Sequence, residues 1–557
     1  MFRTTRSLAA ALLFAALTAA ADPAPAQFRL EEATIADIKA AFDAHALTSK
    51  QLVQLYLDRI AAYEDGGPRL NSITTLNPKA LETAAALDAE RKAGRVRGAL
   101  HGIPVLLKDN VDTYDLPTSN GSVILRNAVP PKDATIARAL RDAGAVILGK
   151  ASMGEFAGGS YNTIDGQVVN PYNFKRQTGG SSAGPAAALA ANFAVLAVGT
   201  DTSTSVRGPS AFNGVVGLRP TTGLISRAGI APKNLNFDTA GPMARTVTDM
   251  AALLSVIAGP DPADPRGLKV WREELKKSGA KAGSKHIDYT RFLDAGALKG
   301  VRLGVVRDFF GGDPEIDALA EAAIAKMKAL GAETVEIHLD PAFVDAYLAK
   351  GGQNIRKIAD YRFKADWETY LREFGPDTPK TVAQFVDIYE NQVNKSPLPV
   401  EDSVLKLLKN SLTTSTDDPD YKKLIAKTLP EGTRLKLALF DIYKVDALVF
   451  PYQSNFAAPI SNPVNKVDDP TFVKSDRPQP SIFAGYDSIG FPGIVVPMGF
   501  GSQGLPMDIS FMGRPYEEGR LIGYAYAYEQ ATKMRKPSPL LPALAGETIG
   551  YPLVGAR

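Results

Sequence analysis

The stretch GGSSAGPAAALAANFAVLAVGTDTSTSVR, residues 179–207, decides the fold of this chain. Its middle part, residues 185–198, is an almost unbroken run of Ala, Leu and Val, which predicts a closely packed, buried helix and not a solvated linker. A turn rich in Gly and Ser precedes this predicted helix, and a turn rich in Ser and Thr follows it. Two hydroxyl-bearing turns are therefore expected at the two ends of one buried element.

Outside this stretch, predicted helices alternate with short apolar strands. Residues 102–107 and 143–149 predict buried strands, and residues 135–142 predict a helix between them. A strand–helix–strand pattern over residues 299–336 is followed by a mostly helical, aromatic-rich region over residues 340–435. Because neither a linker nor a fixed-period repeat divides the sequence, we expect one large α/β domain, with helices covering a sheet and a helical insertion.

The composition excludes several kinds of chemistry. The 557 residues are 45% hydrophobic and 22% charged, which is typical of a globular protein. Lys and Arg outnumber Asp and Glu by 63 to 60, so the charge predicts neither a nucleic-acid partner nor an acidic tail. The chain has no cysteine, which excludes disulfides, iron–sulfur clusters and a cysteine nucleophile. The histidines are far apart in sequence and predict no metal site: His45, His101, His286 and His338.

The first 26 residues have the pattern of a secretory signal peptide. Two arginines precede an apolar run over residues 8–20, and small residues then allow cleavage after Ala21 or Ala26. The run is short for a membrane span, although an uncleaved N-terminal anchor is the alternative interpretation. No later stretch is long and apolar enough to cross a bilayer. We therefore expect a mature chain of residues 27–557 that is secreted or periplasmic.

A lysine stands at the end of one predicted strand. Residues 105–110 read VLLKDN, so Lys108 follows an apolar run and is expected to be buried. A buried amine is costly unless it is paired or neutral, and a neutral amine can accept a proton from a serine hydroxyl. Lys108 and the serine-rich turns could thus activate a serine nucleophile without a histidine. The alternative is a structural salt bridge from Lys108 to Asp109 or Asp201.

Two further motifs match known sites less well. Residues 180–184 fit the G-x-S-x-G motif of a Ser–His nucleophile at Ser182, with His286 or His338 as the partner. That motif needs a strand directly before it, whereas residues 170–178 are polar and predict turns. The G-x-G-x-x-G motif at residues 499–504 is followed by a predicted strand and not by a helix, which indicates a hairpin and not a dinucleotide site.

The order and length of the glycine- and serine-rich motifs carry a resemblance. After the opening stretch, GLRPT follows at residues 217–221 and GPMARTVTD at residues 241–249. Flanking motifs occur at residues 102–109, 149–156, 504–507 and 513–515. From about residue 33 to residue 536 the chain resembles the amidase signature family, most weakly between about residues 260 and 440. The resemblance implies a single amidase-signature domain, with a mixed, twisted β-sheet surrounded by helices and a divergent, mostly helical region on the substrate side.

By position, the resemblance implies a catalytic triad of Lys108, Ser181 and Ser205. Ser205 is the implied nucleophile, Ser181 follows a cis peptide bond and relays the proton, and Lys108 is the base. An acyl-enzyme forms and is hydrolysed by water through the same relay. Four backbone N–H groups are implied as the oxyanion hole, those of Thr202, Ser203, Thr204 and Ser205. The resemblance also implies that Asp201 and Arg207 support this loop. Ser152 and Met153 are implied to contact the substrate.

The chain departs from the family at one point. A glycine pair usually precedes the nucleophile, whereas this chain has Ser203-Thr204. Glycine permits positive φ and close approach of substrate, which a β-branched threonine tolerates poorly. The loop therefore has ordinary dihedral angles, or the oxyanion hole is narrowed, or activity is lost. Because Lys108, Ser181 and Ser205 are retained, we expect an active enzyme with altered access on the acyl side.

The sequence thus predicts a secreted serine amidase that hydrolyses linear C–N amide bonds, other than peptide bonds, without a cofactor or a metal. The expected substrate is a small-molecule amide, such as an aryl, acyl or peptide amide. Two alternatives stay open: an ester or carbamate hydrolase that uses the same triad, and a catalytically silent binding protein. The mature chain is expected to be a monomer or a homodimer.

Overall fold

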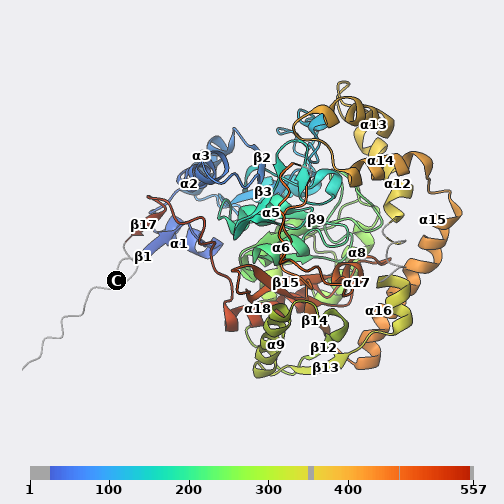
Figure 1. Cartoon of the computed structure of the whole chain (residues 1–557). Helices are drawn as coiled ribbons and strands as arrows, with labels where there is room; N and C mark the ends of the chain where they lie inside the picture. The colour runs from blue at the N-terminus through green and yellow to red at the C-terminus, as the bar shows by residue number, and fades with distance from the viewer. Residues whose placement is uncertain (1–25, 349–354, 356, 463, 552–557) are drawn as a thin grey trace, which may run out of the picture.

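A sheet of 11 strands runs through the centre of the molecule and is surrounded by helices (Figure 1). The structure, a computed structural model, describes residues 26–348, 355, 357–462 and 464–551. The strands of this sheet are β2 (Ile73–Leu76), β3 (Pro104–Lys108), β4 (Val146–Ala151), β9 (Leu196–Asp201), β10 (Val216–Arg219), β11 (Thr239–Ala244), β12 (Arg302–Val306), β13 (Glu333–Ile337), β14 (Ala447–Pro451), β15 (Gly493–Phe500) and β16 (Pro506–Met512). Their order across the sheet is β13-β12-β14-β16-β15-β10-β11-β9-β3-β4-β2.

The sheet is mixed, which confirms the predicted fold class. β3 runs parallel to both of its neighbours, β4 and β9, and β12 runs parallel to β13 and β14. The pairs from β9 through β11, β10, β15 and β16 to β14 are all antiparallel. Because β4, β3 and β9 are parallel, their carboxyl ends meet at one edge of the sheet, and this edge brings Lys108, Ala151 and Asp201 together.

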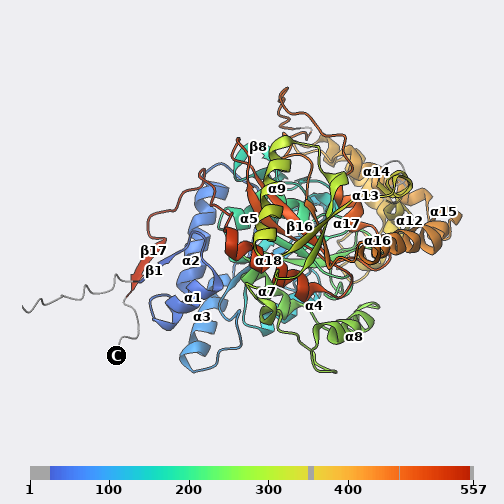
Figure 2. The ribbon, with the colours of Figure 1, turned by 90° about the horizontal axis from the view of Figure 1, so that it is seen from below.

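Helices at the two ends of the sheet come from different parts of the chain. In both views α1 to α3 lie at one end of the molecule and α12 to α16 at the other (Figures 1 and 2). The helices are α1 (Ile35–Asp43), α2 (Ser49–Ile60), α3 (Ala80–Lys92), α4 (Thr135–Asp142), α5 (Ala183–Ala190), α6 (Arg207–Asn213), α7 (Val247–Ile257), α8 (Gly267–Ser278), α9 (Pro314–Ala329), α10 (Pro341–Phe343), α12 (Ile358–Leu371), α13 (Val382–Asn391), α14 (Asp402–Thr413), α15 (Pro419–Lys423), α16 (Leu429–Tyr443), α17 (Pro480–Gly485) and α18 (Glu518–Thr532). Helices α1 and α2 each begin at a capping box. In α1, the side chains of Thr34 and Asp37 each accept a hydrogen bond from the other residue's backbone N–H, and Thr48 and Gln51 do the same in α2.

The small-residue stretch is half helix and half strand, so the prediction of one buried helix over residues 185–198 is wrong. Helix α5 ends at Ala190, and Asn192 takes a left-handed conformation with a φ of 59°. The chain then enters β9, which lies between β11 and β3 and is buried along its whole length. A central strand that is covered on both faces does not need alternating polar and apolar residues. Its continuous apolar sequence therefore resembles that of a buried helix.

The mostly helical region forms a hydrophobic core of its own. Phe363 and Trp367 on α12 are 1% and 0% exposed, and they pack with Phe385 and Tyr389 of α13. Phe156, from the loop after β4, enters this cluster, and its ring centroid lies 5.1 Å from that of Trp367. Phe363 and Trp367, in the region that the resemblance places on the substrate side, are thus core residues.

Short elements complete the fold. Strand β1 (Ala26–Arg29) pairs antiparallel with β17 (Thr548–Tyr551), and the short pairs β5 (Tyr161–Asn162) with β6 (Gly166–Gln167) and β7 (Val169–Asn170) with β8 (Asn173–Gln177) lie outside the large sheet. The predicted signal segment lies outside the described residues, apart from Ala26 in β1. β15 and β16 form an antiparallel hairpin around residues 501–505, as predicted for the glycine motif. In the described part of the chain, every helix is too short or too polar to cross a membrane.

Candidate active site

Four segments of the chain meet at the carboxyl edge of β3 and β9. Lys108 is the last residue of β3, and Asp201 is the last residue of β9. Ser181 lies two residues before α5, and Ser205 lies two residues before α6. The backbone N–H of Ser182 donates to the carbonyl oxygen of Ser205 at 3.1 Å, which joins the two serine turns directly. The strand ends and helix starts of the α/β fold therefore assemble the predicted triad residues in one place.

Lys108 is fully buried and bonded to hydroxyl groups. Its Nζ lies 2.7 Å from Ser181 Oγ and 2.8 Å from Thr200 Oγ1, and its side chain is 0% exposed. Burial lowers the pKa of Lys108 to about 7, against a smaller opposing effect of Asp201. A lowered pKa favours the neutral amine, whose lone pair can accept the proton of Ser181.

The carboxylates next to Lys108 in sequence or space are held by other cations. Asp109 Oδ1 lies 3.6 Å from the ammonium group of Lys150, which is also fully buried. Asp201 forms ion pairs with Arg207 at 3.2 Å and with Arg219 at 2.9 Å. The alternative of a structural salt bridge from Lys108 to Asp109 or Asp201 is therefore wrong. The partners of Lys108 Nζ are two hydroxyl groups and, at 3.4 Å, the carbonyl oxygen of Thr200.

The peptide bond between Gly180 and Ser181 is cis. Ser181 Oγ accepts a hydrogen bond from Lys108, and Ser181 O accepts one from the backbone N–H of Gly154 at 3.2 Å. No Cβ fits on Gly180, because it would lie 1.7 Å from the carbonyl oxygen of Gly159. The serine turn is thus packed directly against the loop that follows β4.

Ser182 has a structural position. Its Oγ accepts a hydrogen bond from the backbone N–H of Thr200 at 3.1 Å and lies 3.1 Å from the Thr200 carbonyl oxygen, to which it donates. This hydroxyl is 0% exposed and is committed to the main chain of β9, which contradicts the alternative of a Ser–His pair through Ser182. Residues 170–178, which lead to Ser182, were predicted to form turns but include the strand β8. This strand pairs with β7 and does not belong to the large sheet.

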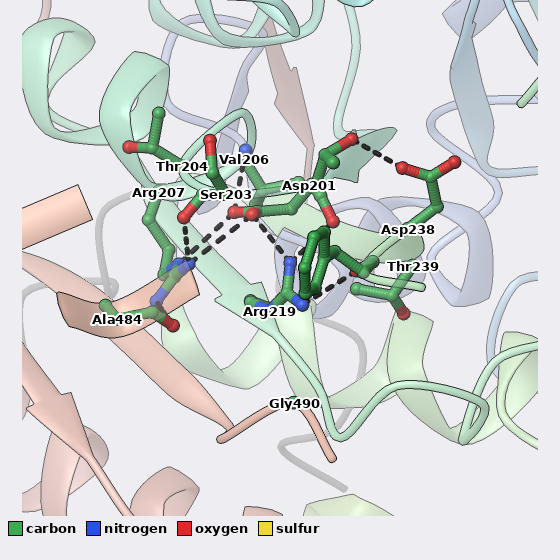
Figure 3. Close-up of polar contacts among 12 residues, drawn as sticks. Asp201, Ser203, Thr204, Val206, Arg207, Arg219, Asp238, Thr239, Ala484 and Gly490 are labelled. Atoms are coloured by element: carbon green, nitrogen blue, oxygen red, sulfur yellow. Dashed lines mark hydrogen bonds and ion pairs between the residues drawn. The ribbon is translucent and has the colours of Figure 1, made fainter. Parts of the chain in front are cut away.

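A buried ion-pair cluster holds the loop between Asp201 and Arg207 (Figure 3). Asp201 Oδ2 accepts from the N–H of Val206 at 3.1 Å and from Arg207 Nε at 3.2 Å, and Oδ1 accepts from Arg219 Nη1 at 2.9 Å. Burial alone would raise the pKa of Asp201, but the two arginines outweigh it and lower the pKa to about 2. Arg207 Nη2 also donates to the carbonyl oxygen of Ser203 at 2.8 Å. The loop is therefore fixed from both of its ends by charged groups.

The loop accommodates Ser203 and Thr204 with ordinary dihedral angles, because neither residue has a positive φ. Thr204 Oγ1 lies 3.0 Å from the hydroxyl group of Tyr452, so its side chain is held beside the loop. Within the described residues, the backbone N–H groups of Ser203, Thr204 and Ser205 have no hydrogen-bond acceptor. The Ser-Thr pair is thus accommodated with ordinary dihedral angles, the first of the three possibilities, and these N–H groups have no acceptor among the described residues.

A glycine on another element makes room for Ser203. Gly485 is the last residue of α17, and a Cβ added there would lie 2.3 Å from Ser203 O and 2.5 Å from Ser203 Cα. Such distances are too short for any side chain, and the blocking atoms are backbone atoms that cannot rotate away. The backbone of the loop at residue 203 thus passes so close to position 485 that only glycine fits there.

The two predicted substrate contacts lie deep in the protein. Ser152 and Met153 directly follow β4, and both are 0% exposed. Ser152 Oγ donates to Asp165 Oδ2 at 2.7 Å and accepts from Asn162 Nδ2 at 2.9 Å. The Ser152 carbonyl oxygen accepts from the N–H of Gly184 at 2.9 Å. The carbonyl contact holds the start of α5, and the two other contacts leave the Ser152 hydroxyl occupied by protein groups.

Several residues of the site were not predicted from the sequence. Thr200 and Arg219 lie inside the glycine-rich motifs, so a search for polar residues at strand ends would have found them. Asp238 directly precedes β11, and Thr202 Oγ1 donates to its Oδ1 at 2.6 Å. Tyr452 and Gly485 come from distant segments and carry no local signal. Among the described residues, no three His, Cys, Asp or Glu side chains gather as metal ligands do.

Comparisons with known proteins agree with this geometry. The family model described as Amidase matches residues 51–522. The chain is 34% identical to a probable amidase of Arabidopsis thaliana, over 92% of each chain. It is 35% identical to one subunit of the glutamyl-tRNA(Gln) amidotransferase of Moorella thermoacetica, over 89% of this chain and 96% of that one. The solved structure of the native peptide amidase from Stenotrophomonas maltophilia is similar with a TM-score of 0.78 and 36% identity, over 91% of this chain and 99% of that one. By sequence and by structure, this chain belongs to the amidase signature family, whose members hydrolyse amides.

Proposed function

We propose that this protein is a secreted serine amidase that hydrolyses linear amides through a triad of Ser205, Ser181 and Lys108. One observation carries the proposal: the amine of Lys108 is fully buried, lies 2.7 Å from Ser181 Oγ and has hydroxyl groups instead of a carboxylate as its partners. A lysine in this environment is a base, since burial favours its neutral form. Ser205 is the most exposed of the three at 8%, as a nucleophile that meets substrate must be.

In the proposed reaction, Ser205 Oγ attacks the carbonyl carbon of the amide. Its proton passes to Ser181 Oγ as the proton of Ser181 passes to Nζ of Lys108. The negative charge that forms on the carbonyl oxygen is accepted by the free N–H groups of Ser203, Thr204 and Ser205. Collapse of the tetrahedral intermediate breaks the C–N bond, and the proton returns from Lys108 through Ser181 to the leaving amine.

The acyl-enzyme is then hydrolysed by the same groups. A water molecule gives its proton to Lys108 through Ser181 and attacks the ester carbonyl carbon of the acyl-enzyme. The proton returns to Ser205 Oγ as the acid leaves, which restores the starting state. Because Asp201 and its two arginines already hold the loop, the oxyanion site needs no rearrangement when charge develops.

A cavity of about 700 Å³ next to α6 is the proposed place of the substrate's bulky group. Gln453 lines this cavity and also lies against Gly208, where an added Cβ would be 3.4 Å from Gln453 Nε2 and 2.9 Å from Thr204 Oγ1. The cavity therefore begins close to the nucleophile loop. The lining is mixed, with Lys466, Asp468, Asp469 and Lys474 among its charged residues. Its apolar residues favour an aryl or alkyl group: Phe212, Phe456, Pro459, Ile460 and Phe472.

Secretion rests on the sequence of the first 26 residues, which favours a cleaved signal and a periplasmic or extracellular mature enzyme. Expression of the full chain, followed by N-terminal sequencing of the exported protein, tests this part separately. Export with cleavage after Ala21 or Ala26 is the expected result. Retention of the intact N-terminus in the membrane fraction would support the anchor instead.

The amidase reaction is tested with the mature protein and two reagents. A fluorophosphonate probe is expected to label Ser205, and a panel of aryl, alkyl and peptide amides, with matched esters and carbamates, measures which bond is cleaved fastest. The Ser205→Ala variant is the control for both measurements. A folded wild-type protein that neither reacts with the probe nor cleaves any member of the panel would favour a silent binding protein. If the ester or carbamate is cleaved faster than the amide with the same acyl group, the result would favour an ester or carbamate hydrolase.

A further inference from the structure

The strand that leads to the relay serine also joins the wall of the proposed substrate cavity. β8 ends at Gln177, four residues before Ser181. The backbone N–H of Gln177 donates to the carbonyl oxygen of Ala458 at 2.8 Å, and both residues line the cavity of about 700 Å³. One wall of this cavity is therefore hydrogen-bonded to the segment that carries Ser181.

A second cavity, of about 250 Å³, lies next to the first. Arg176 lines the second cavity, whereas Gln177, the next residue, lines the first. Successive side chains of a strand point to opposite sides, so β8 presents one residue to each cavity. Polar and charged side chains form much of the lining of the second cavity: Arg176, Asp313, Glu315, Ser502 and Gln503. The second cavity therefore suits a group with a polar end.

Three residues line both cavities and form the partition between them: Asn455, Phe456 and Phe472. Phe456 packs against the hairpin of β15 and β16, where a Cβ added to Gly501 would lie 2.5 Å from its ring. Phe472 belongs to the loop between β14 and α17, and its side chain is half-buried. Asn455 Nδ2 donates to the carbonyl oxygen of Val473 at 3.0 Å and so holds this loop. The apolar part of the partition therefore consists of two aromatic rings.

A buried arginine holds the ring of Phe472 in the partition. The Phe472 N–H donates to the carbonyl oxygen of Asp469 at 3.1 Å, which closes a turn. Asp469 Oδ1 accepts from the N–H of Thr471 at 2.9 Å, and Oδ2 accepts from Arg176 Nη2 at 2.8 Å. The guanidinium carbon of Arg176 also lies 5.8 Å from the centroid of the Phe472 ring, and Arg176 is only 7% exposed. Arg176 on β8 therefore contacts both the turn and the ring.

We propose that Phe472 is a specificity-determining residue of this amidase, whose ring closes the substrate cavity against the second cavity and limits the length of the group that the substrate can carry. The inference rests on the proposed function, because it assumes that a group of the amide occupies the larger cavity. Phe472 would meet the end of that group and not the reacting atoms. Loss of the ring would join the two spaces and admit a longer chain with a polar end.

The test is a comparison of chain-length profiles for single variants of the mature enzyme. Phe472→Ala removes the ring, Phe472→Leu shortens the side chain, and Phe472→Tyr keeps the ring. Val464→Ala is the matched control, because it removes an apolar side chain of the same loop that is 49% exposed and lies outside both linings. Thermal unfolding shows whether each variant is folded.

Two series of amides supply the chains, each with linear chains of two to twelve carbon atoms that end in a hydroxyl group. One series varies the acyl chain on a fixed aryl amine, and the other varies the amine chain on a fixed aryl acyl group. For each protein, kcat/KM is measured along both series, and the rate of fluorophosphonate labelling of Ser205 is measured without an amide.

In the wild type, kcat/KM in one series is expected to fall once the chain is long enough to meet Phe472. In Phe472→Ala, the chains just beyond this limit are expected to be cleaved about tenfold faster, because the fit of a single methylene group in a pocket is worth at least this much. Phe472→Leu is expected to move the limit in the same direction by less. The shortest chains, and all chains in Phe472→Tyr and Val464→Ala, are expected to keep the wild-type profile.

Three results would overturn the inference. The wild type has no length limit in either series, or Phe472→Ala and Phe472→Leu keep the wild-type limit, or Val464→Ala moves the limit equally. Failure of the proposed function looks different, because wild-type Ser205 would then not react with the probe and neither series would be cleaved. A reactive Ser205 and cleaved amides with an unmoved limit would refute only the role of Phe472.

Discussion

Gly485→Ala is expected to damage catalysis from outside the triad. The added Cβ would lie 2.3 Å from Ser203 O, whereas ordinary contact begins at about 3.4 Å, so the carbonyl group or α17 must move by about 1 Å. The carbonyl group cannot move freely, because Arg207 Nη2 donates to it at 2.8 Å. A displacement of this size at the nucleophile loop is expected to lower kcat about a hundredfold. The overpacking is expected to lower the free energy of unfolding by about 1–3 kcal/mol.

The assay compares Gly485→Ala with Gly375→Ala, since a Cβ at Gly375 meets nothing within 4 Å. Thermal unfolding, kcat for the best amide of the panel and the rate of probe labelling at Ser205 are measured for both variants and the wild type. The expected result is a large loss of kcat for Gly485→Ala and unchanged kinetics for Gly375→Ala. Wild-type kcat together with wild-type stability in Gly485→Ala would refute the idea that position 485 makes room for Ser203.

The remaining predictions concern the triad itself. Ser205→Ala is expected to abolish turnover without unfolding the protein, because one small hydroxyl group contributes little to the core. Activity assays and circular dichroism check the two parts of this prediction. Wild-type activity in this variant would disprove the role of Ser205 as the nucleophile. The kcat/KM of the wild type is expected to rise with pH through a midpoint near the Lys108 pKa of about 7 and then to level off, because the neutral amine is the active form. Lys108→Ala should remove this dependence with most of the activity, whereas His286→Ala and His338→Ala should leave the profile in place; loss of the ionisation in either histidine variant would contradict the lysine base. Treatment with a chelator is expected to leave the rate unchanged, and a loss that a divalent cation reverses would show a metal requirement.

The fold was largely predictable wherever the hydrophobic pattern differs between helix and strand. The helix over residues 135–142 has the predicted bounds, and the strands that end at Lys108 and begin near Val146 lie where the apolar runs are. Residues 185–198 were assigned wrongly because both α5 and β9 are buried on every side, so neither needs polar residues. The usable signal was Asn192, since asparagine is one of the few residues that take a left-handed conformation after a helix.

The candidate site was predictable only as far as the motifs extend. Lys108, Ser181 and Ser205 stand at strand ends or helix starts, where buried apolar runs stop and polar residues begin. Gly485 contacts the nucleophile loop at Ser203 from a helix that has no motif of its own. Contacts of this kind depend on distances between segments, such as the 2.3 Å at Gly485, which no local pattern of residues contains.

Phe156 gives the helical region a direct connection with the reacting groups. Its ring is part of the aromatic core formed by α12 and α13, while its carbonyl oxygen holds Lys233 and its loop carries Gly159, against which the serine turn rests. Phe156 also has a positive φ of 48°, a conformation that is uncommon for a residue with a side chain. The helical region and the serine turn are therefore joined through one loop, and we expect them to open or unfold together. We therefore expect the effect of a sequence change deep in α12 or α13 to reach the serine turn through this loop, without any contact with the substrate.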